Sequence, residues 1–239
     1  MKSQLIKENF RKLDNSQKKG SGTPVYTRYV NRFIGRLLAA IFATFNISPN
    51  TVSFFSAGLT FISFVLFLLM PSITILESSI LVLVLYFSYA LDSADGQLAR
   101  LLSRQSKQGE WLDHFLDALK IPFSHGVAIL FIISKIETIT YTHLVFFLVI
   151  ISLSSANFLS NILKSKLLVS KNSETTTMSH KTNIVRSVLT LPLDYGFFIT
   201  IFLFAYEINI FSTIYYFYGI VLILYSILLF FKTWRELKQ

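Results

Sequence analysis

Long apolar runs separated by short polar connections dominate the chain from about residue 49 onward. A run of about 20 apolar residues lets a helix cross the hydrocarbon core of a bilayer. The pattern therefore predicts six membrane-spanning helices, near residues 51–70, 73–92, 111–134, 140–162, 185–206 and 209–231. These runs use most of the chain and leave no room for a second soluble domain. The expected fold class is an all-α integral membrane protein.

Two segments of different character precede the first apolar run. Residues 1–22 are polar and basic and end in Lys-Lys-Gly-Ser-Gly, so we expect a mobile tail without a cleavable signal peptide. Residues 23–48 predict an amphipathic interfacial helix, because arginines recur every four residues among apolar side chains. A short helix packed on the spans is the alternative. Ser48 as N-cap and Pro49 as first helical residue then begin the six-helix membrane domain, residues 49–233.

Composition supports a membrane protein and predicts its orientation. Hydrophobic residues make up 53% of the 239 residues, and the mean hydropathy is +0.56. Of the 22 lysines and arginines, 21 lie in the first 50 residues, in 92–120, in 163–186 or at the C-terminus, and the opposite connections hold only Lys135. The positive-inside rule thus predicts that both termini and the 92–120 connection are cytoplasmic. This bias also accounts for the net charge of +9, so no nucleic-acid partner is expected.

Two pairs of aspartates lie between the second and third apolar runs. Asp92 and Asp95 are three residues apart, and Asp113 and Asp117 are four apart, so each pair lies on one helix face. The polar connection 101–108 is short, which makes the two helices antiparallel neighbours and brings the four carboxylates to one membrane depth. Carboxylates are costly in a membrane and repel one another, and bound cations are the simplest remedy.

The residue types around these aspartates favour phosphate and metal chemistry. Oxygen ligands without cysteine or a close histidine cluster point to Mg²⁺ or Mn²⁺ instead of zinc. Four carboxylates can hold two such ions about 3.5–4 Å apart, as two-metal phosphoryl-transfer sites do. Gly96 and Ala99 allow close approach of a nucleotide, and Arg100 can bind a phosphate bidentately. The absence of cysteine excludes disulfides and thiol catalysis.

The complete pattern, Asp-x2-Asp-Gly-x2-Ala-Arg and, after eight residues, Gly-x3-Asp-x3-Asp, resembles the signature of the CDP-alcohol phosphotransferase family. All eight fixed positions are present: Asp92, Asp95, Gly96, Ala99, Arg100, Gly109, Asp113 and Asp117. The resemblance implies that an acceptor alcohol attacks the β-phosphorus of a CDP-alcohol, which forms a phosphodiester and releases CMP. It also implies a homodimer.

The resemblance further implies roles for individual residues. Asp92, Asp95 and Asp113 match metal ligands, and Asp117 matches a residue that lies at the metal site and is the general base on the acceptor hydroxyl. A family element Pro-Asn-x-x-Thr corresponds to 49–53, with serine in place of the threonine, and a nucleotide-binding hydroxyl is expected six residues after the arginine. The residues expected to bind the CDP-alcohol are Asn50, Ser53, Gly96, Ala99, Arg100 and Ser106.

Two residues of the third apolar run are candidates for an acceptor pocket. Lys120 lies one turn beyond Asp117, and His125 lies two turns deeper on nearly the same face, where a buried hydrogen-bonded histidine is an equal alternative. Lys120 and Asp194 are both expected about 12 Å inside the membrane. Because an unpaired charge is costly there, we predict an ion pair between them, with acceptor-phosphate binding by Lys120 as the alternative.

The signature leaves the substrates open. CDP-diacylglycerol can donate a phosphatidyl group to a polar alcohol, or a CDP-linked polar headgroup can be transferred to a lipid or another alcohol. A divalent-cation or proton-coupled transporter is a rival, because intramembrane carboxylates also mark ion paths. Its acidic residues should be spread through the membrane depth, whereas here the aspartates other than Asp194 cluster at one side. A non-catalytic scaffold would leave the four aspartates unexplained.

Overall fold

The structure is a computed structural model that describes residues 2–15, 26–168 and 194–238. Within these ranges the regular elements are all helices. Five of its helices are long and apolar enough to cross a membrane. They are α3 (Pro49–Leu69), α4 (Ile75–Leu101), α5 (Lys107–Lys135), α6 (Tyr141–Leu168) and α9 (Ile208–Lys238). The expected all-α membrane fold is thereby confirmed.

The described part of the chain has five long spans instead of the predicted six. The sixth prediction, residues 185–206, falls partly outside the described ranges. Its described part is the short helix α8 (Tyr195–Ile201) followed by the 3₁₀ turn η3 (Phe202–Phe204). The helix begins at Tyr195 because the Asp194 side chain accepts the Gly196 N–H as an N-cap.

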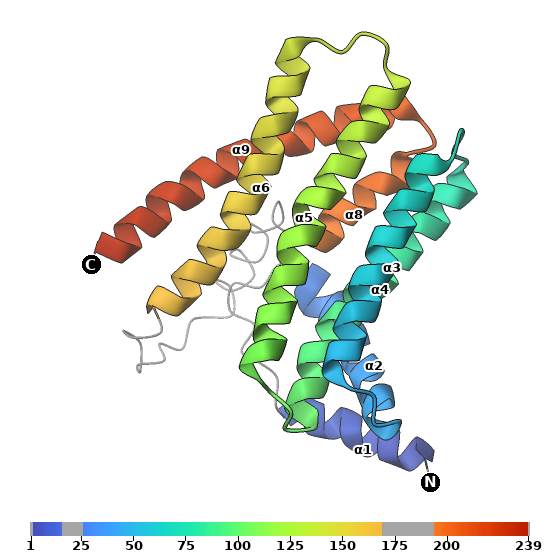
Figure 1. Ribbon diagram of the computed structural model, residues 1–239, viewed down its shortest axis with the longest axis vertical. Coiled ribbons are helices and arrows are strands. Elements are labelled where there is room, and N and C mark those ends of the chain that lie inside the picture. Colours follow the sequence, from blue (N-terminus) through green and yellow to red (C-terminus); the bar gives the residue numbers. More distant parts are fainter. Residues whose placement is uncertain (1, 16–25, 169–193, 239) are drawn as a thin grey trace.

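The long helices form a bundle in which α3 and α4 lie side by side and α5 lies between them and α6, while α9 crosses obliquely (Figure 1). Helix α4 packs against α3, against α8 and η3, and against α2 (Arg32–Thr44). The main core is rich in aromatic side chains, among them Phe64, Phe67, Phe131, Phe202, Phe211 and Tyr215. Figure 1 shows that α1 and α2 lie at the end of the bundle where α4 joins α5. The same end therefore carries the aspartate pattern.

Local capping fixes the helix boundaries at this end. The Ser48 hydroxyl accepts the Thr51 N–H at 3.2 Å, with Pro49 as the first helical residue, as the sequence predicts. The Ser106 hydroxyl accepts the Gly109 N–H at 3.0 Å and starts α5. Helix α4 continues to Leu101, past the predicted end at residue 92, and α5 begins at Lys107, before the predicted start at residue 111, so all four aspartates are helical.

The N-terminal region differs from the expected mobile tail. Residues Lys2–Asn15 form α1, which packs on α2, and Leu13 is buried. The Asn9 amide donates to the Thr44 hydroxyl at 3.3 Å, so a polar contact also holds the two helices together. Residues 16–22 lie outside the described ranges. The physical reason for the difference is that α2 offers α1 a partner, which the polar composition of 1–22 does not reveal.

Helix α2 has features of both alternatives considered for residues 23–48, the amphipathic interfacial helix and the short helix packed on the spans. One face packs closely on α4, where a Cβ on Gly35 would lie 2.9 Å from the Ser93 Cβ. Another face exposes the large apolar side chains of Phe33 and Leu37. Such a helix suits a membrane surface, and its interfacial position stays a prediction.

Asp194 ties the segment before α2 to the start of α8. Its Oδ2 accepts the N–H groups of Tyr26 and Thr27 at 3.1 and 3.3 Å, and its Oδ1 accepts the Thr27 hydroxyl at 3.0 Å. The same Oδ1 accepts the Gly196 N–H at 3.1 Å. The side chain is 1% exposed. This carboxylate therefore accepts four hydrogen bonds, from Tyr26, Thr27 and Gly196, and none of its partners is the predicted Lys120.

We expect Asp194→Asn to lower the free energy of unfolding by about 1–3 kcal/mol, because one acceptor oxygen becomes an NH₂ group that faces N–H donors. Thermal unfolding of the purified protein in detergent, followed by circular dichroism, measures the change. The matched control is Asp14→Asn. Asp14 forms an exposed surface pair with Arg36, and its loss should cost less than about 1 kcal/mol. An unfolding temperature unchanged in Asp194→Asn would contradict this role.

Candidate active site

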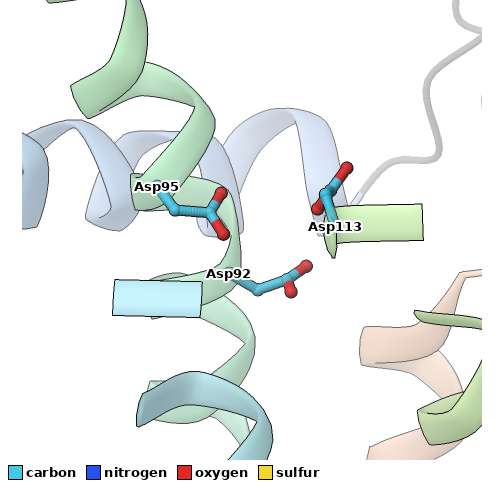
Figure 2. A group of neighbouring side chains, drawn as sticks. All are labelled: Asp92, Asp95 and Asp113. Atoms are coloured by element: carbon cyan, nitrogen blue, oxygen red, sulfur yellow. The ribbon is translucent and has the colours of Figure 1, made fainter. Parts of the chain in front are cut away.

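Three carboxylates from two helices meet at one point. Asp92 and Asp95 lie on α4 and Asp113 lies on α5, and one oxygen from each is within 4.8 Å of the other two. Figure 2 shows Asp92 and Asp95 reaching from α4 toward Asp113. Asp95 is buried and the other two are partly exposed. A compact set of oxygen donors at this spacing suits a hard divalent cation such as Mg²⁺ or Mn²⁺.

Asp117 lies one helical turn beyond Asp113 and has a different partner. Its Oδ1 is 2.8 Å from the Nζ of Lys120, which also forms an ion pair with Asp92. Lys120 is only 4% exposed. The predicted ion pair between Lys120 and Asp194 is therefore wrong. Lys120 lies three residues after Asp117 on the same face of α5, so its nearest anions are those of the aspartate cluster.

Helix α3 holds one of the clustered carboxylates in place. The Ser53 hydroxyl donates to Asp95 Oδ2, and the Gly96 N–H lies 2.5 Å from Asp95 Oδ1. Ser53 is 6% exposed, so water competes little for this bond. The family resemblance gave Ser53 a contact with the nucleotide, and the structure adds a contact with a candidate metal ligand. Hydrogen bonds of this kind orient ligands and tune metal affinity.

A cavity of about 440 Å³ opens on one side of the cluster, between α3, α4 and α5. Its volume suits a nucleotide-sized ligand. Asp95 and Asp113 lie at its edge. The cavity is lined by every residue expected to bind the CDP-alcohol: Asn50, Ser53, Gly96, Ala99, Arg100 and Ser106. We call it the donor-side cavity.

A second cavity, of about 460 Å³, lies on the other side of the cluster. It shares Asp95, Gly96, Arg100 and Asp113 with the donor-side cavity, so the candidate metal ligands stand at the boundary between the two. The additional lining residues include Asn31, Arg32, Asp92, Asp117, Lys120 and Tyr195. We call it the acceptor-side cavity. Two adjoining cavities that share a metal centre can hold two substrates against each other.

The acceptor-side cavity contains polar groups that sequence analysis did not assign. Burial lowers the pKa of Arg32, yet a guanidinium stays protonated at neutral pH. The Asn31 side chain is 2% exposed, and among the described residues its Oδ1 has no hydrogen-bond partner. The arginine repeat in 23–48 predicted an amphipathic interfacial helix, but only the packing of α2 on α4 brings these two residues to the cluster.

His125 does not line the acceptor-side cavity. It is 3% exposed, its Nδ1 is 3.2 Å from the Tyr215 hydroxyl, and its ring packs against Phe198. It lines a neighbouring cavity of about 100 Å³ that shares Tyr195 with the acceptor-side cavity and also contacts Asp194. The alternative of a buried, hydrogen-bonded histidine therefore describes His125. Of the two candidates for the acceptor pocket, Lys120 lines the acceptor-side cavity and His125 does not.

The model of the CDP-alcohol phosphatidyltransferase family matches residues 46–232. This range begins at Asn46, two residues before the Ser48 cap, and ends at Lys232 in the last part of α9. It contains all four aspartates. A search of individual curated proteins found no match.

We expect Ser53→Ala to weaken Mn²⁺ binding by about 10–100-fold, because Asp95 loses the hydroxyl that orients its carboxylate. Titration with Mn²⁺ monitored by electron paramagnetic resonance (EPR) measures the affinity. Ser56→Ala is the matched control: Ser56 is a fully buried serine of the same helix whose hydroxyl donates to the Ser88 carbonyl oxygen, away from the site. Equal Mn²⁺ affinities for the two variants would show that the Ser53–Asp95 bond has no such role.

Proposed function

The chain belongs to the CDP-alcohol phosphatidyltransferase family, and we propose that its donor is CDP-diacylglycerol and its acceptor a polar alcohol. Family membership makes it a transferase that moves a phosphoalcohol group from a CDP-alcohol to an acceptor alcohol in lipid synthesis. With CDP-diacylglycerol as donor, the group transferred is phosphatidyl and the leaving group is CMP. A cation transporter is set aside by this assignment.

The observation that carries the proposal is the aspartate cluster at the boundary between two cavities. Asp92, Asp95 and Asp113 are the residues that would hold Mg²⁺ or Mn²⁺. When bound, the cation would neutralise charge on the pyrophosphate and make the phosphorus more electrophilic. The geometry of three convergent oxygen donors supports this assignment.

The residues of the donor-side cavity would bind the CDP part of the donor. Arg100 lines both cavities, and its Nε is buried without a hydrogen-bond partner among the described residues. A guanidinium in this place suits a pyrophosphate that bridges the two cavities. The absence of side-chain bulk at Gly96 and Ala99 leaves room for the phosphates beside α4. Ser106 and Asn50 add polar groups for the rest of the nucleotide.

The residues of the acceptor-side cavity would place the attacking alcohol. In this mechanism the acceptor oxygen forms a bond to the β-phosphorus, the bond from that phosphorus to the CMP oxygen breaks, and the acceptor proton passes to Asp117. Asp117 lines this cavity, which supports its role as the base. Arg32, Asn31 and the aspartates give this cavity a polar lining, so a polar acceptor suits it better than an apolar one.

An apolar cavity of about 390 Å³ between α5 and α6 supports a lipid as one of the substrates. Trp111, Phe115 and Leu159 line it, and it shares Ile121 and Phe158 with the acceptor-side cavity. An acyl chain there can belong to a phosphatidyl donor, since diacylglycerol is attached at the reacting phosphate. It can also belong to a lipid acceptor, which is the arrangement required for transfer of a CDP-linked headgroup. That reaction is the second candidate function.

The distribution of basic residues supports an active site that faces the cytoplasm. Arg100, Arg104 and Lys107 lie near the aspartates, whereas Lys135 lies at the opposite end of α5. By the positive-inside rule we propose that both termini and both cavities face the cytoplasm. The homodimer implied by the family resemblance stays a prediction.

The deciding experiment incubates the purified protein with Mn²⁺, a CDP-alcohol and an acceptor, and measures CMP by chromatography. CDP-diacylglycerol with polar alcohols or phosphorylated polyols is expected to yield CMP. EDTA should stop the release and added Mn²⁺ should restore it, because an all-oxygen site binds the ion reversibly. CMP formed only from CDP-linked headgroups with a lipid acceptor would favour the second candidate. Undiminished turnover after complete removal of metal would contradict the mechanism.

We expect Asp117→Asn to reduce CMP release at least about 100-fold, because an amide cannot accept the acceptor proton. The variants Asp92→Asn, Asp95→Asn and Asp113→Asn should lose CMP release together with Mn²⁺ binding. Each variant is compared for membrane insertion and for unfolding temperature. Glu137→Gln is the matched control: this exposed acid follows α5 at the opposite end and should retain full activity. Full activity in any two of the four aspartate variants would reject the site.

A further inference from the structure

The acceptor-side cavity has one wall that the family signature does not cover. Thr27, Asn31 and Arg32 line the cavity there. They belong to the π-helical turn η1 (Thr27–Asn31) and to the first residue of α2, which continues it. All three precede residues 46–232, the range that the family model matches. Membership of the family therefore assigns them no role.

Hydrogen bonds hold this wall against α4 at both of its ends. The hydroxyl groups of Thr27 and Tyr89 are 2.8 Å apart, and the Gln97 side chain donates to the Arg32 carbonyl oxygen at 3.1 Å. Between these contacts the Arg32 N–H donates to the Thr27 carbonyl oxygen, which closes the π turn. Single π turns within helices are frequent at functional sites. The turn thus holds Asn31 in a defined position at the cavity.

Asn31 has none of the structural roles that are usual for an asparagine at the start of a helix. Asparagine often caps a helix with its side chain, but Asn31 is itself helical (φ −61°, ψ −46°) and its side chain caps no N–H group. Asparagine within a continuous helix is less favourable than most residues. Asn31 is 2% exposed, and in the part of the chain that the structure describes its Oδ1 has no hydrogen-bond partner. Such a group lowers stability, and a binding role accounts for its presence.

The neighbouring neutral side chains of the cavity differ from Asn31 in this respect. Four others line it, and the hydroxyl of each lies within 3.3 Å of a hydrogen-bond partner in the protein: Thr27, Tyr89, Ser93 and Tyr195. These hydroxyl groups are already used to hold helices together. The amide of Asn31 is therefore the better candidate for contact with a substrate.

The chemistry of an amide indicates which group it would bind. A side-chain amide carries an acceptor oxygen and an NH₂ donor, and a hydroxyl group can pair with either. An ammonium can only donate, and in this cavity it would lie with the guanidinium groups of Arg32 and Arg100. A phosphate oxygen can only accept, so it would leave the amide oxygen unpaired. A hydroxyl group therefore suits Asn31 best.

We propose that Asn31 is a specificity-determining residue that selects polyols as acceptors. Its amide hydrogen-bonds one hydroxyl of the acceptor while another hydroxyl attacks the β-phosphorus and gives its proton to Asp117. An alcohol with a single hydroxyl cannot do both. This inference rests on the proposed function, in which the acceptor is a polar alcohol, and it narrows that class to alcohols with at least two hydroxyl groups.

The test compares acceptors that differ by one hydroxyl group. Full-length purified protein is incubated with Mn²⁺ and CDP-diacylglycerol, and CMP release is measured with glycerol, glycerol 3-phosphate and myo-inositol. Each polyol that gives CMP is then compared with its analogue that lacks one non-reacting hydroxyl, such as 3-hydroxypropyl phosphate for glycerol 3-phosphate. Ethanolamine serves as an alcohol with one hydroxyl and an ammonium. Wild type is expected to prefer the polyol to its analogue about 10–100-fold in kcat/KM, the effect of one buried hydrogen bond.

Variants of Asn31 show whether this residue causes the preference. Asn31→Leu replaces the amide with an apolar group of similar size. It is expected to lower kcat/KM for the polyol about 10–100-fold and to leave the analogue unchanged, so that their ratio falls to about one. The KM for CDP-diacylglycerol should stay the same. Asn31→Ala gives the same comparison if Asn31→Leu does not fold.

Asn9→Ala is the matched control. Asn9 is also a buried asparagine, but its amide donates to the Thr44 hydroxyl, where α1 packs on α2. Its loss can loosen α2 without touching the acceptor-side cavity, so this variant should keep the wild-type ratio between polyol and analogue. A ratio that falls equally in Asn9→Ala and in the Asn31 variants overturns the inference, because α2 packing would then explain it.

The possible failures are distinguishable. A ratio unchanged in the Asn31 variants overturns the role of Asn31 and leaves the proposed function intact. Wild-type protein that uses ethanolamine or the analogues as well as the polyols overturns the inference without any variant. If no pair of CDP-diacylglycerol and a polar alcohol yields CMP, the proposed function is overturned and this inference with it.

Discussion

Electrostatic repulsion between four carboxylates at the edge of a membrane is the constraint on which this structure depends. The aspartates of α4 and α5 can converge only if cations offset that repulsion. Lys120 is the cation that the chain itself supplies, and it contacts an aspartate on each helix. The neighbouring helices then stabilise the arrangement: α3 contributes the hydroxyl of Ser53, and α2 packs against α4 at Gly35.

Features that depend on short sequence separations could be predicted. Spacings of three and four residues place two aspartates on one face of a helix whatever its surroundings. The Ser48 cap also follows from local sequence. Asn50, Ser53 and Ser106 of the donor-side cavity were expected from the family resemblance instead, because Asn50 and Ser53 lie on α3 and reach the aspartates only through helix packing. The family resemblance supplied chemical roles for them that spacing alone does not give.

Features that depend on how helices rotate and pack could not be predicted. Equal membrane depth suggested a pair between Lys120 and Asp194, but depth does not fix which way a side chain points around its helix. Asp194 instead caps α8 and accepts backbone N–H groups. The contribution of Arg32 likewise depends on the packing of α2 against α4. The helical state of 2–15 depends on a partner helix that is remote in sequence.

The two cavities differ in which parts of the chain supply their lining residues. The donor-side cavity is lined entirely by residues between Pro49 and Asp113, a continuous stretch that includes most of the aspartate pattern. The acceptor-side cavity draws on segments as distant as Thr27 and Tyr195, which the hydrogen bonds of Asp194 tie together. In the proposed mechanism, substitutions in those outlying segments would therefore alter which alcohol is accepted while recognition of the nucleotide is retained. A chain built this way would allow new lipid products to evolve while the means of activating the donor stays the same.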